Sequence, residues 1–185
     1  SVLLGTPLLY VVSIALASDE TTYLAKFTLF PHEFHFDNFV KIFQMDLSFG
    51  RFFLNSLTLV GFSIIGQVIA SSMVAYGFAR LRAPGKDFLF LILLSTMMIP
   101  GEVTMIPSFV IFKYLGWINT LLPLIVPNFF SNAFNVFLLR QFIARIPTEL
   151  DEAAQLDGLG FFGIYWRIIL PLIRPALIAI AIFTF

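Results

Sequence analysis

The side chains of this 185-residue sequence that could take part in chemistry fall at three places. The first is a single acid that follows Pro100 and Gly101 inside an otherwise apolar stretch. The second is a set of amides at intervals of four and three residues. The third is an acidic, alanine-rich stretch that ends at a glycine. In chain order they are Glu102; Asn128, Asn132 and Asn135; and Glu149, Asp151, Glu152, Ala153, Ala154, Asp157 and Gly158.

Several kinds of chemistry lack the residues that they need. There is no cysteine, which removes disulfides and thiolate metal sites. His32 and His35 are three residues apart and follow a proline, whereas a helical zinc pair needs a spacing of four. The phosphate-binding pattern GxxxxGK[ST] is also missing, so no ATP site is visible. We therefore expect no catalytic residue, no metal site and no cofactor bound by this chain.

The composition indicates an integral membrane protein. The mean hydropathy is +0.94, only 12% of the residues are charged, and there are 24 phenylalanines. Phe52–Ala79 and Tyr114–Leu139 carry no formal charge, and each exceeds the roughly 20 residues that a helix needs to cross a bilayer. Continuous apolar runs favour helices over barrel strands, which alternate apolar and polar residues.

Charged residues divide the sequence into five predicted spans. They are 2–17, 52–79, 88 to about 112, about 118 to 139, and an unfinished one from about 171. A signal peptide ending near Ala17 is the alternative for the first span, but no basic segment precedes it.

Basic residues predict the orientation, because they concentrate in cytoplasmic loops. Segments 80–87 and 140–174 carry Arg80, Arg82, Lys86, Arg140, Arg145, Arg167 and Arg174. The other two connections carry Lys26, Lys41, Arg51 and Lys113. The acidic stretch is therefore expected in the cytoplasm, and the loop 18–51 outside.

The third and fourth spans each contain a polar feature with two readings. Pro100, Gly101 and Pro107 are expected to break the third span near the outer surface. Glu102 there either lines or gates a hydrated path, or lies in the membrane interface. Asn128, Asn132 and Asn135 are expected on one helical face, which either borders the path of a polar solute or forms hydrogen bonds between helices. In the second span, Ser71, Ala75 and Ala79 at a spacing of four predict a close helix contact.

The acidic stretch predicts a short helix that begins after Pro147. Thr148 and Asp151 are spaced as a capping box, in which each side chain bonds the backbone amide of the other. Ala153 and Ala154 are expected to leave one face nearly bare, so that another surface can approach the backbone. Gly158 can take the left-handed conformation that ends a helix, with Asp157 bracing the turn.

The spacing from Glu152 to Pro171 resembles a known family signature. Glu-Ala-Ala at 152–154 is followed by Gly158, Ile168, Leu170 and Pro171, as in the EAA loop of membrane subunits of ATP-binding-cassette (ABC) importers. FLNSLTLV, VAYGFARLRAPGKDFLF and MMIPGEVTMIPSFVIFKYLGWINT, with much of the rest of the chain, are similar to sugar permeases of the maltose-transporter type.

This resemblance implies an all-α polytopic transmembrane bundle of the type I ABC importer kind. Such a subunit pairs with a second permease in the inner membrane of a bacterium or archaeon, and a solute-binding protein delivers sugar from outside. Its EAA loop forms a coupling helix that docks on a cytoplasmic ATPase dimer, which binds ATP and Mg²⁺. Carried over by position, the docking residues are Glu152, Ala153, Ala154, Asp157 and Gly158.

The expected organisation is one transmembrane permease domain, 1–185, truncated at both ends and showing five spans of six. Within it, 18–51 forms an extracytoplasmic loop and 144–170 the cytoplasmic coupling loop. Alternative functions are a permease for glycerol phosphate, peptides, amino acids or metals. A membrane scaffold or enzyme is the alternative from another class.

Overall fold

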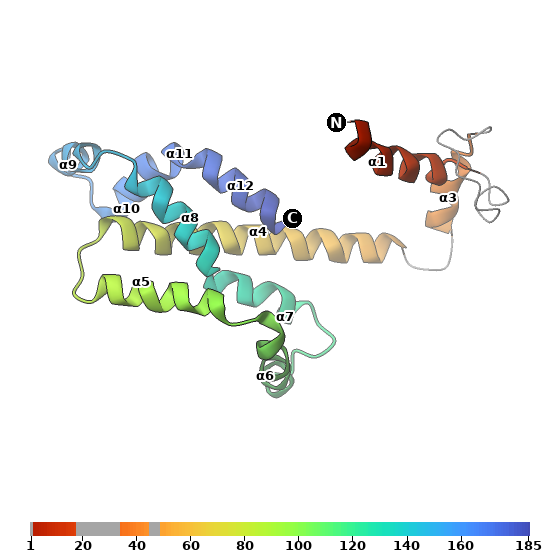
Figure 1. The fold of residues 1–185 in the computed structure, drawn as a ribbon, viewed down its shortest axis with the longest axis horizontal. Coiled ribbons are helices and arrows are strands. Elements are labelled where there is room, and N and C mark those ends of the chain that lie inside the picture. The colour runs from red at the N-terminus through yellow and green to blue at the C-terminus, as the bar shows by residue number, and fades with distance from the viewer. Residues whose placement is uncertain (1, 18–33, 45–48) are drawn as a thin grey trace. The chain divides into compact units, whose positions relative to one another are not determined.

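A computed structural model of the chain describes residues 2–17, 34–44 and 49–185. All of their regular elements are helices, as predicted (Figure 1). The chain divides into two compact units, residues 1–54 and 55–185, which we describe separately.

The first unit contains helices α1 (Val2–Ala15) and α3 (Asp37–Gln44). The Asn38 side chain of α3 donates hydrogen bonds to the carbonyls of Ala15 and Ala17, at 3.2 and 2.9 Å. These bonds satisfy carbonyl groups that the end of α1 leaves without helical partners. Much of the predicted outer loop 18–51 lies outside the described residues.

The second unit begins within the longest helix, α4, and continues through short helices joined by tight breaks. The elements are α4 (Phe49–Arg80), α5 (Lys86–Ser95), η1 (Thr96–Met98), α6 (Gly101–Tyr114), α7 (Leu122–Ile125), η2 (Val126–Phe130), α8 (Ala133–Ala144), α9 (Glu149–Leu156), α10 (Phe161–Ile164), η3 (Tyr165–Ile169), α11 (Leu170–Leu172) and α12 (Arg174–Thr184).

Two helical segments are long and apolar enough to cross a membrane, namely 49–80 and 122–144. Two further pairs qualify only if each counts as one bent span: 86–98 with 101–114, and 161–172 with 174–184. A shorter apolar helix lies at 5–15. The described residues therefore contain two to four candidate spans.

The third predicted span breaks at Pro100, as expected, but not at Pro107. The axes of 86–98 and 101–114 differ by 97°, and the break follows Ile99, whose backbone is extended (Figure 1). Pro100 then forms the N-cap of α6, so its missing amide hydrogen costs no helical bond. The expectation that Pro107 also interrupts the span is wrong, because α6 continues through it.

The core of the second unit lies where α4 meets the C-terminal helices. Ser71 and Ala75 are fully buried, and Ala79 packs at the edge of the core, which confirms the predicted close contact. The Ser72 hydroxyl lies 2.7 Å from the Tyr165 hydroxyl of η3. Small side chains on α4 thus bring the aromatic start of the last helices close to its backbone.

Candidate functional site

The predicted acidic helix is present as α9, but it is not capped as expected. It begins at Glu149, directly after Pro147 and Thr148, and acids occupy its first turn. The capping-box prediction is wrong, because Thr148 has helical backbone angles and its side chain makes no cap hydrogen bond. Asp151, the expected partner of Thr148, pairs with Arg80 instead.

The Arg80–Asp151 pair is buried at the end of α4. Arg80 Nε lies 2.9 Å from Asp151 Oδ2, and the two side chains are 8% and 11% exposed. Burial raises the pKa of the Asp151 carboxyl; Arg80 beside it offsets part of that rise, and Glu152 adds to it. The charged form of this carboxylate therefore depends on Arg80 in the folded chain.

Gly158 ends α9 as predicted. Its φ of +84° lies in the left-handed region, which costs a residue with a side chain free energy. The Leu159 amide donates to the Ala154 carbonyl at 2.9 Å, and the Gly158 amide to the Gln155 carbonyl at 3.0 Å. This Schellman pattern fixes the direction in which the chain leaves α9.

The two alanines of α9 face in different directions, which corrects the expectation of one bare face. Ala153 is exposed, whereas Ala154 is only 4% exposed and belongs to the core. The exposed part of α9 includes Glu152 and Leu156, and Leu156 is 90% exposed. Ala154 and Asp151 thus attach α9 to its own chain, and the remaining residues are free to meet another surface.

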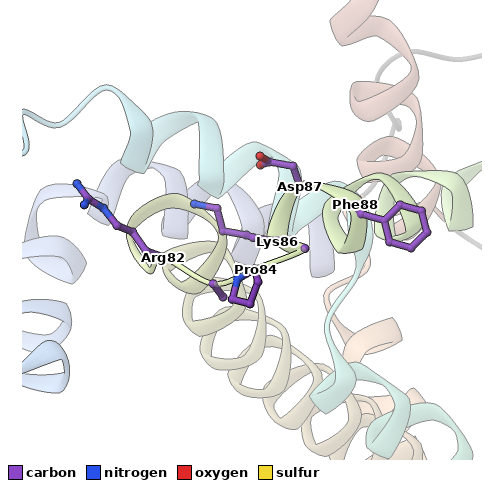
Figure 2. Close-up of a pocket in the computed structure, with 7 residues that line it drawn as sticks. Arg82, Pro84, Lys86, Asp87 and Phe88 are labelled. Carbon is purple, nitrogen blue, oxygen red and sulfur yellow. The ribbon is translucent and has the colours of Figure 1, made fainter.

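Two hollows lie near this end of α4. One, of about 610 Å³, is lined by residues of both α4 and α9, among them Arg80, Asp151, Glu152 and Gln155. The other, of about 480 Å³, lies at the turn between α4 and α5 (Figure 2). There the Lys86 ammonium group donates to the Leu81 carbonyl at 3.1 Å and so caps the end of α4.

Two of the three asparagines of the fourth span, Asn128 and Asn135, bind a residue that sequence reasoning missed, Gln67 of α4. Gln67 Nε2 donates to Asn128 Oδ1 at 3.0 Å, and Asn135 Nδ2 donates to Gln67 Oε1 at 3.1 Å. Ser71 donates to the same Oε1 at 3.2 Å, and Asn128 Nδ2 donates to the Ser63 hydroxyl at 3.0 Å. We call Ser63, Gln67, Ser71, Asn128 and Asn135 the amide cluster.

The prediction that all three asparagines share one helical face is wrong. Ser131, with φ +67° and ψ +164°, breaks the helix between η2 and α8. Asn132 is the N-cap of α8, and its side chain accepts a hydrogen bond from the Phe134 amide at 2.8 Å. The break separates Asn132 from the cluster that Asn128 and Asn135 form.

Glu102 lies apart from these groups. It is exposed in the first turn of α6, where the helix dipole favours a negative charge. Within the described part of the chain, no hydrogen bond or ion pair joins it to the three asparagines or to Lys113. The structure therefore does not bring the predicted path residues into one site.

Signals for the missed residues were present in the sequence. Gln67 is the only glutamine in the uncharged segment Phe52–Ala79, and Leu156 is an apolar residue in an acidic helix. The partner of Asp151 could not be read from spacing, because Arg80 is far away along the chain.

Comparison with known proteins identifies the architecture. Residues 67–185 match the family model described as binding-protein-dependent transport system inner membrane component. The chain belongs to this family.

Individual relatives agree with the family. The chain is 33% identical over 178 residues to the polygalacturonan/rhamnogalacturonan transport system permease protein of Bacillus subtilis, covering 96% of this chain and 60% of the relative. It is 30% identical over 186 residues to the diacetylchitobiose uptake system permease protein of Streptomyces coelicolor, covering 100% of this chain and 61% of the relative.

A solved structure also matches, that of a bacterial ABC transporter involved in the import of the acidic polysaccharide alginate. The TM-score is 0.84 at 26% identity, over 97% of this chain and 63% of the other. The chain thus spans about 60% of the length of these relatives. Family membership makes it an inner-membrane transport component rather than an enzyme, as the sequence predicted.

Proposed function

We propose that this chain is the membrane-spanning permease subunit of an ATP-driven, binding-protein-dependent sugar importer. Its family, and its similarity to permease proteins for polygalacturonan/rhamnogalacturonan and for diacetylchitobiose, support a carbohydrate as the solute. In this proposal each bent pair is one span and the shorter apolar helix at 5–15 belongs to another, which gives five spans of a six-span domain.

The observation that carries the proposal is the arrangement of α9. Glu149 and Glu152 are exposed, and so is the apolar Leu156, while Ala154 is buried. A large apolar side chain that is 90% exposed within an acidic helix is suited to a partner with an apolar pocket and a basic rim. We assign α9 as the coupling helix, with Glu152, Ala153, Leu156, Asp157 and Gly158 toward the partner and Ala154 as its inner support.

The partner is a cytoplasmic ATP-binding-cassette ATPase dimer, which would bind the ATP and Mg²⁺ that this chain has no motif to hold. Closure of that dimer would displace α9 as a rigid body and change the access of the bundle. A second permease subunit and an extracytoplasmic solute-binding protein complete the transporter. The amphipathic helix α3, within the outer segment 18–51, is the candidate contact for the binding protein.

The translocation path is a separate part of the proposal. Asn128 and Asn135 donate their amide hydrogens within the amide cluster, which favours a packing role for both. Asn132 caps α8. Glu102, exposed beside the break at Pro100, remains the candidate for a hydrated path or gate.

Two variants of α9 test the coupling role. Leu156→Ala removes the exposed apolar group, and we expect the ATPase to bind the membrane subunits about tenfold more weakly, as for loss of an interface anchor. Glu152→Lys reverses a charge on the same surface and should lower ATP-dependent sugar uptake in cells while leaving membrane insertion intact. Binding is measured by pull-down of the ATPase at graded concentrations, and uptake with radiolabelled oligosaccharide.

Asp87→Lys is the matched control, because it makes the same charge change at an exposed position in the first turn of α5. Full uptake and unchanged ATPase binding by both α9 variants would refute the coupling role. Loss of uptake by Asp87→Lys to the same extent would point to a general charge effect.

A further inference from the structure

Arg80, the last residue of α4, binds two points of the segment that carries α9. Its Nε pairs with Asp151 at 2.9 Å, and its Nη2 donates to the Ile146 carbonyl at 2.6 Å. Ile146 precedes α9, and Asp151 lies in the first turn of α9. One planar guanidinium group therefore fixes both the approach to the helix and its first turn.

The start of α9 lacks the usual means of fixing its direction. Pro147 has no amide hydrogen, and the Thr148 side chain makes no cap hydrogen bond. The Asp151 and Glu152 amides donate only to the Thr148 carbonyl, within the helix itself. The contacts of Arg80 thus supply the connection between α4 and the start of α9 that local capping does not.

The other end of the segment is also bound by the last turns of α4. The Tyr76 hydroxyl donates to the Phe161 carbonyl at 3.2 Å, and the Tyr76 and Tyr165 rings lie 5.4 Å apart. Along the chain, Ala154 lies between these two attachments, and it is buried. The last turns of α4 therefore bind the chain at the start of α9 and again at the start of α10.

We propose that Arg80 is the positioning residue of the coupling surface, orienting α9 through Asp151 and Ile146 so that Leu156 and the acids face the partner. The assignment of the surface rests on the proposed function, whereas the orienting contact belongs to this chain alone. Lysine cannot replace Arg80 fully, because its single ammonium nitrogen cannot supply two separate nitrogens, one beside Asp151 and one bonded to the Ile146 carbonyl.

The contact is tested by the accessibility of Ala154. Because the chain has no cysteine, Ala154→Cys and Ala153→Cys provide single thiols at one buried and one exposed position of α9. The permease subunits, in inverted membrane vesicles from cells that lack the ATPase expected to cover Ala153, are treated with a membrane-impermeant maleimide. We expect Ala154→Cys to react at least about tenfold more slowly than Ala153→Cys. The buried thiol can react only when α9 moves transiently away from the core.

Adding Arg80→Leu should then raise the reaction rate of Ala154→Cys about tenfold, since it leaves Asp151 buried without its partner. Arg80→Lys should give an intermediate rate. The reaction of Ala153→Cys should not change, and Arg82→Leu, which removes an exposed arginine two residues further on, should not affect either thiol. If Ala154→Cys remains protected in Arg80→Leu, the positioning role is wrong.

A second readout separates positioning from general stability. In proteoliposomes of the complete transporter that enclose the sugar and its binding protein, Arg80→Leu should reduce the sugar transported per ATP hydrolysed, and Arg80→Asp with Asp151→Arg should restore part of the ratio. An unchanged ratio despite faster labelling would overturn the link to coupling. If the unmodified transporter imports no sugar but the labelling results hold, the proposed function fails and the orienting contact stands.

Discussion

Two regions bind other helices to α4 with polar side chains, and they use different chemistry. The amide cluster joins α4 to η2 and α8 through neutral groups within a predicted span. The other region joins α4 to α9 through the charged pair of Arg80 and Asp151 at the end of α4. The difference follows from the surroundings, because a charge at membrane depth is costly, whereas at the end of α4 each charge has an opposite charge beside it.

The comparison predicts that charge is tolerated poorly in the amide cluster. Gln67→Glu keeps the shape of the side chain but places an acid beside Asn128 and Asn135. We expect it to destabilise the folded subunit by about 3 kcal/mol, the cost of an acid at membrane depth. The measurement is the denaturation midpoint of the purified transporter in mild detergent.

Gln141→Glu makes the same change near the end of α8 and should shift the midpoint much less. Equal shifts for the two variants would mean that the amide cluster is as well hydrated as the helix end, and the proposed contrast would be lost.

The packing beside the amide cluster supplies the second prediction. A Cβ at Gly66 would lie 2.8 Å from Phe129 Cδ2, so the ring of η2 packs directly against the α4 backbone. Gly66→Val should destabilise the subunit by about 1–3 kcal/mol through overpacking. Gly61→Val, in the same helix with open space around its Cβ, is the matched control in the same denaturation assay.

Adding Phe129→Ala should recover part of the stability lost in Gly66→Val, because it removes the ring that the new side chain meets. If the two losses simply add, the close approach does not cause the effect.

The end of α9 supplies the smallest effect. Gly158→Ala meets open space but must keep a φ of +84°, which costs about 1 kcal/mol for a residue with a Cβ. We expect faster hydrogen exchange at the Leu159 amide, whose bond to Ala154 depends on that turn. Gly160→Ala, at a φ of −78° in similarly open space, should leave the exchange rate unchanged.

The sequence predicted the features that depend on local chemistry. Apolar runs predicted the helices, Pro100 the break, Ser71 and Ala75 the close contact, and Gly158 the end of α9. Each of these follows from the properties of a residue and its near neighbours along the chain, and these do not change when the chain folds.

The errors at Asp151 and Ala154 involve contacts that are distant in sequence, whereas the error at Asn132 comes from the backbone of its neighbour. Asp151 does not bond Thr148, its expected local partner, because it forms an ion pair with Arg80. Asn132 left the predicted face because Ser131 breaks the helix and frees the amide to cap α8. Ala154 turned inward because α9 needs a contact with the core. Spacing alone cannot show which of two possible partners a polar side chain will meet.

Gln67 and Arg80 lie on one continuous helix, separated along its axis by about 20 Å at 1.5 Å per residue. Such a rod acts as a lever. A tilt of about 10° about one of these residues would move the other by about 3 Å, as far as a hydrogen bond is long. A displacement of α9 can therefore be transmitted along α4, from Arg80 to Gln67 in the amide cluster.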